Sequence, residues 1–191
     1  MSIRIWVALF IKTLGLGAVA ALFFGLILLN PFSTGNFLGF FVTTAIMGLL
    51  FSAISQMGFF AYLTLHRIGL GMFKSHSLWS KVQWVLIAFT FFDLVYLRYQ
   101  AFAKDHESVF SYLVLPAILL VVSYIVAEIK KRETNHYAFV PTMFLMFVVT
   151  AIEWIPDLRT NDQWLWIMGG TLLACNTYQV LKLHRLLRAN Q

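Results

Sequence analysis

Three ionisable residues, Asp93, Arg98 and Glu153, stand inside long apolar stretches. A charged side chain at mid-membrane depth costs about 2.5–3.5 kcal/mol on insertion scales, so such residues usually face a protein interior, pair with one another or function. Asp93 and Arg98 diverge by roughly 140° around a helix. Two side chains of one helix form an ion pair when they are three or four residues apart. We therefore predict separate partners and an ion pair between Arg98 and Glu153. The alternative is that Arg98 reaches outward to the lipid headgroups.

Other polar residues continue the face that carries Asp93. Tyr96 and Gln100 follow it at helical spacing, and Ser52 and Gln56 stand one turn apart in the preceding apolar stretch. We expect Ser52 to lie across from Asp93. These five residues fit either a polar pocket that opens to the outer side of a membrane or a hydrogen-bonded network that fixes helix register.

The elements that must position these residues are membrane helices. The chain is 60% hydrophobic and 12% charged, whereas a soluble domain has about 25% charged residues. A span needs about 20 mostly apolar residues, and six segments qualify. We predict an all-α fold in which residues 1–191 form a single integral membrane domain, a bundle of six transmembrane helices. The predicted spans are about 5–29, 37–65, 82–103, 109–127, 137–155 and 164–181.

The basic residues predict the orientation of this bundle, because Lys and Arg collect in cytoplasmic loops. Alternate loops and both termini hold eleven of the fourteen Lys and Arg residues, and the other side holds Arg98, Lys104 and Arg159. Both termini are therefore predicted to be cytoplasmic. The distribution matters more than the net charge of +6, which therefore does not indicate nucleic-acid binding.

Small residues recur every four positions in the first two predicted spans. The first stripe is Gly17, Ala21 and Gly25, and the second is Thr44, Gly48, Ser52 and Gln56. Small residues let helix backbones approach closely in lipid, so these stripes predict helix–helix packing. The second stripe is also polar enough to line a cavity.

A basic, partly apolar segment, 67–81, follows the second span and is predicted to be a cytoplasmic loop. Such a mixture suits a segment that lies in the inner membrane interface beside anionic lipid. It suits equally a surface that docks a partner. The candidate partner-contact residues of this loop are Arg67, Phe73, Lys74, Trp79 and Lys81.

Catalytic and metal-binding motifs are missing from the sequence. There is no HExxH, no GxSxG and no Cys/His dyad, and the one cysteine, Cys175, lies in an apolar run. We expect no cofactor, no metal and no enzymatic activity. An enzyme would have to work with Asp93, Arg98 and Glu153 alone.

Three stretches resemble a known family: HRIGLGMFKSHSLW (66–79), VQWVLIAFTFFDLVYLRY (82–99) and FVPTMFLMFVVTAIEWIP (139–156). They are similar to the KinB-signalling-pathway activation protein family (KbaA) of spore-forming bacilli. The resemblance implies a multi-pass protein of the bacterial cell membrane that is not an enzyme. It also implies that the protein helps the sensor histidine kinase KinB to feed the phosphorelay of sporulation, with that kinase as its partner. It assigns no site residues.

A second class of function stays open on the residues themselves. A six-span chain of this length suits a small-molecule binding or transport component, whose pocket would lie near Asp93. A cavity that reaches the outer face beside Asp93 would favour that interpretation, and a tightly packed centre would count against it.

Overall fold

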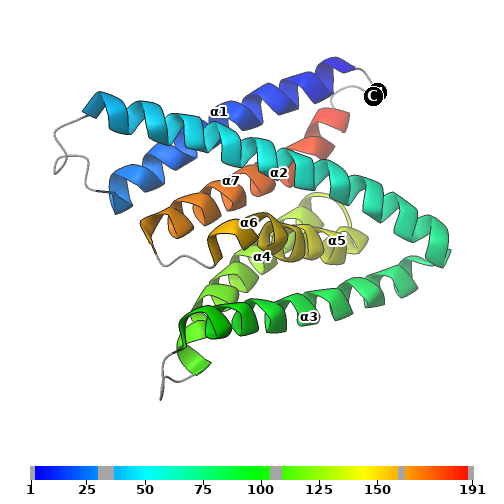
Figure 1. Cartoon of the computed structure of the whole chain (residues 1–191). Coiled ribbons are helices and arrows are strands. Elements are labelled where there is room, and N and C mark those ends of the chain that lie inside the picture. The colour runs from blue at the N-terminus through cyan, green and yellow to red at the C-terminus, as the bar shows by residue number, and fades with distance from the viewer. Residues whose placement is uncertain (1–2, 30–36, 104–108, 159–161, 189–191) are drawn as a thin grey trace. The chain divides into compact units, whose positions relative to one another are not determined.

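The computed structural model describes residues 3–29, 37–103, 109–158 and 162–188, and these residues are helical almost throughout (Figure 1). The all-α prediction is confirmed for this part of the chain. The elements are α1 (Ile3–Leu28), α2 (Phe37–Phe73), α3 (His76–Phe102), η1 (Val109–Tyr112), α4 (Val114–Glu133), η2 (His136–Ala138), α5 (Phe139–Phe144), η3 (Leu145–Val149), α6 (Thr150–Leu158) and α7 (Gln163–Arg188).

Four of the described segments are long and apolar enough to cross a membrane. They are Ile3–Leu28, Phe37–Phe73, His76–Phe102 and His136–Leu158, the last of which joins η2, α5, η3 and α6. The predicted spans 109–127 and 164–181 correspond to α4 and α7. The last turns of α4 hold a charge run, and α7 carries polar residues at its centre. The count of six spans and the orientation therefore stay predictions.

The contacts divide the chain into two compact units. Unit 1 comprises Met1–Phe59 and Thr160–Gln191, and unit 2 comprises Phe60–Arg159. Helix α2 contributes residues to both units. The prediction of a single membrane domain over 1–191 is neither confirmed nor contradicted by this division.

Unit 1 is held together where small residues meet. A Cβ atom placed on Gly17 would lie 2.6 Å from the carbonyl oxygen of Gly48, and one on Gly48 would lie 2.7 Å from the Cβ of Ala21. The backbones of α1 and α2 are therefore in close contact along the predicted stripes. Helix α1 also packs against α7, where Gly170 makes room for the ring of Phe24.

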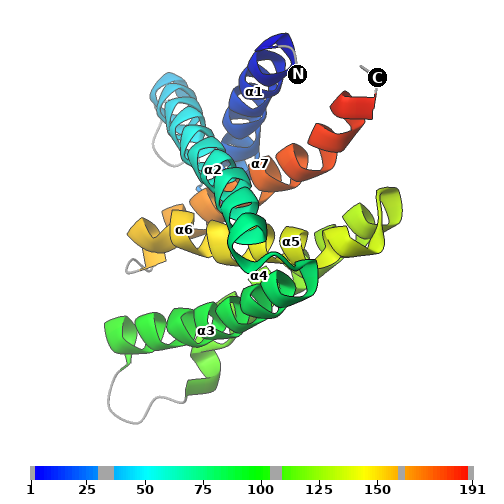
Figure 2. The same ribbon diagram turned by 90° about the vertical axis from the view of Figure 1, so that its right-hand side faces the viewer.

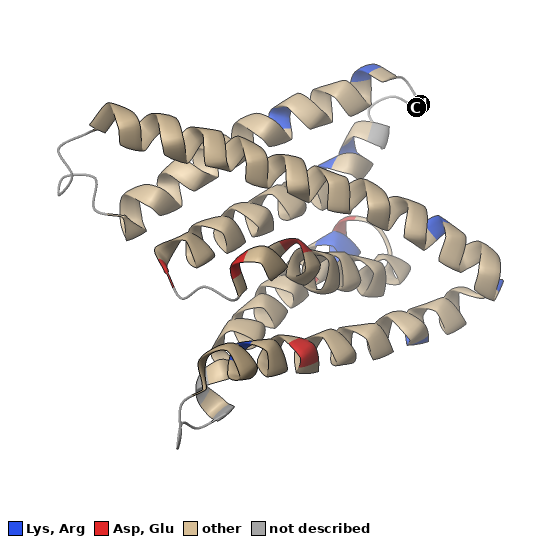
Figure 3. Ribbon diagram, in the orientation of Figure 1, with Lys and Arg blue, Asp and Glu red and all other residues tan. Residues whose placement is uncertain are grey.

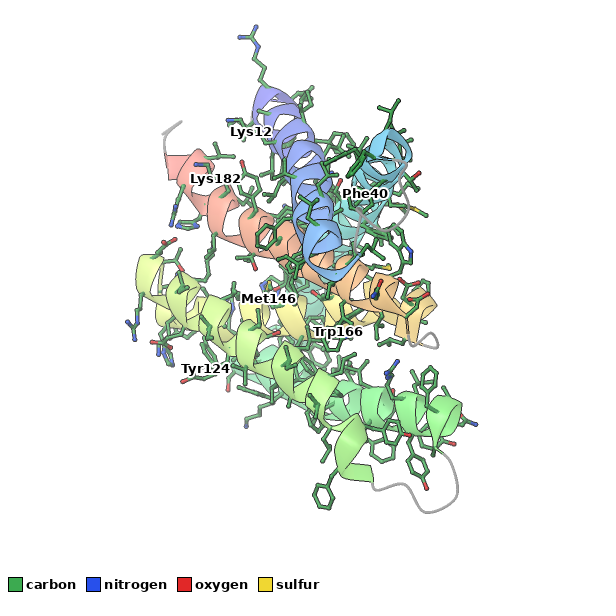
Figure 4. All side chains as sticks on the ribbon, turned by 90° about the vertical axis from the view of Figure 1, so that its left-hand side faces the viewer. Lys12, Phe40, Tyr124, Met146, Trp166 and Lys182 are labelled. Atoms are coloured by element: carbon green, nitrogen blue, oxygen red, sulfur yellow. The ribbon has the colours of Figure 1, made fainter. Side chains whose placement is uncertain are left out.

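Unit 2 is built around the segment from α5 to α6. Its central part, Leu145–Val149, is a π-helical turn, and helices α3 and α4 pack against it. Figure 4 labels Met146 in this turn and Tyr124 on α4. Met146 is fully buried, whereas Tyr124 is about half exposed. Such π-helical turns occur mostly inside α-helices and often at functional sites.

Helices continue past two of the predicted span ends, and one predicted loop is corrected. Pro156 follows the predicted fifth span, 137–155, and lies inside α6, which continues to Leu158; a proline inside a helix removes the backbone hydrogen bond to the carbonyl four residues earlier. Helix α4 likewise continues through the charge run after Ala127 to Glu133. The predicted loop 67–81 is mostly helix, because α2 runs to Phe73 and α3 begins at His76.

The charge run stays helical because its charges pair at helical spacing. Glu128 accepts hydrogen bonds from Lys131 and Arg132, each at 3.1 Å. Pairs at three and four residues stabilise a helix modestly. Lys131 and Arg132 hold the pKa of Glu128 below its usual value, and their hydrogen bonds are the main cause.

This pair predicts a small pH dependence of stability. Because the folded pKa of Glu128 is lowered, its stabilising contribution is present at neutral pH and is lost as the pH falls through that folded pKa. We expect the difference in melting temperature between the wild type and Glu128→Gln to be largest near pH 7 and to shrink below about pH 4. Thermal unfolding of both proteins in detergent from pH 7 to pH 3 measures it. A constant difference would contradict the pairing.

Candidate functional site

Asp93 lies in the second half of α3 and is half-buried. Figure 3 shows one red, acidic position on α3, with uncharged residues in tan on either side of it. Among the residues that the structure describes, the Asp93 carboxylate has no hydrogen-bond or ion-pair partner. The residues that α3 buries are Trp79, Gln83, Ile87 and Leu94. Asp93 therefore stands at the edge of the buried face, beside the face that points away from the core of unit 2.

The two residues predicted to share the face of Asp93 are exposed. Tyr96 is 50% exposed, and Gln100 is exposed at the end of the same face. The ring of Tyr96 stacks on Phe92, with centroids 6.1 Å apart. The structure thus brings Asp93, Tyr96 and Gln100 onto one side of α3, as their spacing predicts. Whether they line a pocket or form a network stays a prediction.

Ser52 and Gln56 belong to unit 1, whereas Asp93 belongs to unit 2. The hydroxyl of Ser52 donates to the carbonyl of Leu49 at 2.9 Å. Gln56 is 2% exposed, and neither atom of its amide has a hydrogen-bond partner among the described residues. The predicted approach of Ser52 to Asp93 stays a prediction.

Arg98 is engaged at the end of α3. Its Nη1 donates to the carbonyl oxygen of Leu158 at 3.0 Å, and its guanidinium carbon lies 4.6 Å from the centroid of the Phe102 ring. Glu153 is 7% exposed on α6, which packs against α3 in unit 2. The predicted partner helix is thus the neighbour of α3, and the ion pair between Arg98 and Glu153 itself stays a prediction.

A tight helical corner replaces the predicted partner-contact loop (Figure 2). Lys74 has a left-handed backbone with φ 51°, and the side chain of Ser75 caps α3 by accepting from the Leu78 N–H. Such a φ is uncommon outside glycine, and here it lets α2 turn directly into α3. Arg67, Lys74 and Lys81 are exposed, as a contact with a partner or with lipid requires.

Among the predicted partner-contact residues, Trp79 is not exposed, because it packs inside the corner and is only 4% exposed. Its Nε1 donates to Nδ1 of His66 at 3.0 Å, and its ring stacks on half-buried Phe73 with centroids 5.6 Å apart. A Cβ atom on Gly69 would lie 2.6 Å from the Trp79 ring. The role that the structure supports for Trp79 is to join the ends of α2 and α3.

The corner predicts opposite effects for two glycines of one helix turn. Gly69→Ala should lower the free energy of unfolding by about 1–3 kcal/mol, because overpacking costs that much and the Trp79 ring is held by its hydrogen bond to His66 and its stacking on Phe73. Gly71 has nothing within 4 Å of its Cβ position, so Gly71→Ala should be neutral or stabilising by up to about 1 kcal/mol. Thermal unfolding in detergent compares the two. Equal behaviour of both variants would contradict the packing of Trp79 on Gly69.

A buried polar cluster in unit 1 was not predicted from the sequence. The hydroxyl of Ser55 donates to Oδ1 of Asn176 at 2.8 Å, and Nε2 of Gln179 donates to Oγ of Ser55 at 2.7 Å. All three residues are at most 1% exposed. The sequence did carry one sign of this cluster, because Asn176 and Gln179 are three residues apart and therefore share one face of α7. We call these residues the amide cluster.

The described residues hold no group of three or more His, Cys, Asp or Glu side chains that could bind a metal ion. An open pocket of about 450 Å³ lies in unit 1 and is lined by Leu29, Asp162, Gln163, Trp164 and Trp166. Its lining includes none of the residues predicted to form a polar pocket. Neither feature assigns a chemical reaction to the chain.

Helix content and apolar spans define the class as an all-helical protein with several candidate membrane spans. Comparison with known sequences gives the family. Residues 14–186 match the profile of KbaA, described as KinB-signalling pathway activation in sporulation. The chain is 46% identical to the KinB-signaling pathway activation protein of Bacillus subtilis (strain 168) over 138 residues. This matched stretch covers 72% of this chain and 70% of the relative.

The chain belongs to the KbaA family. This confirms the resemblance drawn from the stretches 66–79, 82–99 and 139–156. The family name describes signalling activation rather than a reaction. No solved structure matches the chain.

Proposed function

We propose that this chain activates KinB signalling in sporulation as a non-enzymatic accessory protein of the bacterial cell membrane. Its relative, 46% identical over 72% of the chain, is named for activation of that pathway, and this likeness carries the proposal. The partner is the sensor histidine kinase itself, and the contact lies within the membrane and at the cytoplasmic corner.

The physical character of the chain supports a membrane site of action. Four described segments are long and apolar enough to span a bilayer. The exposed side chains of α1 and α3 include Phe23, Ile27, Val85, Phe89 and Phe92, each at least 59% exposed. Soluble proteins rarely expose large apolar patches, whereas hydrocarbon tails solvate exposed apolar side chains.

The proposed topology has six spans with both termini in the cytoplasm. Helices α4 and α7 are then the remaining two spans. In α7 the polar residues Asn176 and Gln179 are buried and bonded within unit 1, which removes much of the cost of placing them in lipid. Reporter fusions at each terminus and each predicted loop test this arrangement, and opposite locations of the two termini would overturn it.

Complementation tests the function. The gene for the relative is deleted in Bacillus subtilis, this chain is expressed in its place, and KinB-dependent spore formation is counted. We expect spores to return only when KinB is also present. Failure to restore them despite membrane insertion would overturn the proposal, as would equal restoration in a strain without KinB.

A further inference from the structure

We propose that the outward face of α3 docks a transmembrane helix of a partner protein, and that this helix carries a lysine or arginine at the depth of Asp93. The docking face consists of the exposed residues Val85, Phe89, Phe92 and Tyr96, with half-buried Asp93 at its edge. The identity of the partner, KinB, rests on the proposed function. The site and its charge requirement rest on the structure of unit 2.

The face is turned away from the unit it belongs to. Val85, Phe89, Phe92 and Tyr96 are 50–67% exposed, whereas Gln83, Ile87 and Leu94 on the other side of α3 are at most 3% exposed. An exposed apolar face in a membrane protein is satisfied by lipid, so these rings alone require no partner. The carboxylate among them is the feature that lipid does not satisfy.

When α3 spans a bilayer, Asp93 lies far from the headgroups on either side. Nine residues separate it from Phe102, the last residue of α3, which is about 14 Å at 1.5 Å per residue. Half of a typical hydrocarbon core is about 15 Å, so Asp93 reaches the middle of the bilayer when α3 spans it. The short aspartate side chain reaches less far toward the headgroups than a lysine or arginine side chain does.

The described residues of unit 2 do not neutralise this charge. Arg98 points to Leu158 and to the Phe102 ring, and no described residue bonds the Asp93 carboxylate. A cation on a second helix would satisfy it, because an opposite charge is worth most where water is excluded. Phe89, Phe92 and Tyr96 would surround the same cation with aromatic rings, which attract cations by their faces.

A second copy of this chain is a poor occupant of the face. In a twofold dimer whose axis runs along the membrane normal, residues of equal depth meet, so Asp93 would face Asp93. Two carboxylates that face each other across a dimer interface repel, so it costs free energy to keep both ionised. The charge on the face thus favours a different protein with a basic residue at that depth.

Photo-crosslinking tests the face directly. Phe92 and Tyr96 are replaced, one at a time, by the photoreactive analogue p-benzoylphenylalanine in the complementing strain that carries tagged KinB. Val121 on α4, which is 57% exposed, receives the same analogue as the matched control. We expect adducts with KinB from positions 92 and 96 and at least tenfold fewer from 121. Adducts within the same chain or with a second copy would overturn the proposal, as would equal adducts from all three positions.

Charge variants test the requirement for Asp93. Asp93→Asn should lower KinB-dependent spore counts at least tenfold with an unchanged amount of protein in the membrane and an unchanged melting temperature, and Asp93→Glu should restore most of the activity. Asp93→Lys should be rescued by an acidic residue in place of one intramembrane basic residue of KinB. If the wild type complements and Asp93→Asn does so equally, the inference is wrong and the proposed function stands. If the wild type fails to complement, both are overturned.

Discussion

Gly48→Ala is expected to lower the free energy of unfolding of this protein by about 1–3 kcal/mol, the usual cost of overpacking a close contact. The added methyl group would lie 2.5 Å from the carbonyl oxygen of Gly17, 2.7 Å from the Cβ of Ala21 and 2.8 Å from the Cα of Ala18. Two of these neighbours are backbone atoms of α1, which no rotamer change can move. Helices α1 and α2 must therefore separate, and the packing that replaces apolar burial in lipid is lost.

Gly15→Ala is the matched control for this prediction. Gly15 is also a glycine inside α1, and nothing lies within 4 Å of its Cβ position. Alanine there should be neutral or stabilising by up to about 1 kcal/mol, since glycine is a poor helix former. Unfolding in mixed detergent micelles, followed by tryptophan fluorescence, gives both free energies. A Gly48→Ala protein as stable as the wild type would show that the two backbones do not approach as described.

The packing of unit 1 was predictable because it depends on local spacing. Residues four apart lie on one helix face, so the stripe of Gly17, Ala21 and Gly25 and the stripe of Thr44, Gly48 and Ser52 indicated a close helix pair before any contact was known. The structure places Thr44 against Gly25 and Ser52 against Gly17. The same periodicity also predicted that Asp93 and Tyr96 share one side of α3.

Two features could not be read from spacing. Periodicity tells which residues share a face but not which neighbour covers that face, so the exposed side of α3 was equally compatible with a pocket wall. The corner at Lys74 depends on one left-handed residue and on the fit of Trp79 against Gly69. A lysine gives no local signal for that backbone conformation, and the basic residues around it favoured a loop.

The amide cluster was missed for a related reason. Ser55 on α2 is 121 residues from Asn176 and 124 residues from Gln179, both on α7, and no sequence motif joins them. Polar residues within an apolar stretch indicate that each has a hydrogen-bonding partner. Only the packing of the helices shows which residue that partner is.

Asn176→Leu is expected to lower the free energy of unfolding by about 1–2 kcal/mol, because removal of one partner leaves a buried donor unpaired. The hydroxyl of Ser55 donates to Oδ1 of Asn176 at 2.8 Å, and Ser55 is fully buried. Leucine fills a similar volume, so the loss reports the hydrogen bond rather than a cavity. Interhelical hydrogen bonds in membranes average about 0.6 kcal/mol and reach about 1.7, which places this variant near the upper end.

Thr171→Val separates this loss from the general effect of removing a buried polar atom. Thr171 is fully buried on the same helix, but its hydroxyl donates to the carbonyl of Ile167 in its own turn. That carbonyl already belongs to the helix ladder, so valine should cost about 0.5 kcal/mol or less. If Thr171→Val lowered the free energy of unfolding as much as Asn176→Leu does, the hydrogen bond between α2 and α7 would contribute no more stability than a bond within one helix.

The decisive measurement is a double-mutant cycle between α2 and α7. Ser55→Ala removes the hydroxyl that Asn176 accepts from and that Gln179 donates to. If the bond is as described, Ser55→Ala with Asn176→Leu should be more stable than the sum of the single losses predicts, by about 0.5–1.5 kcal/mol. Replacing both partners leaves fewer unsatisfied groups than replacing one. Additive losses would mean that Ser55 and Asn176 do not meet, and that the polar centre of α7 serves another contact.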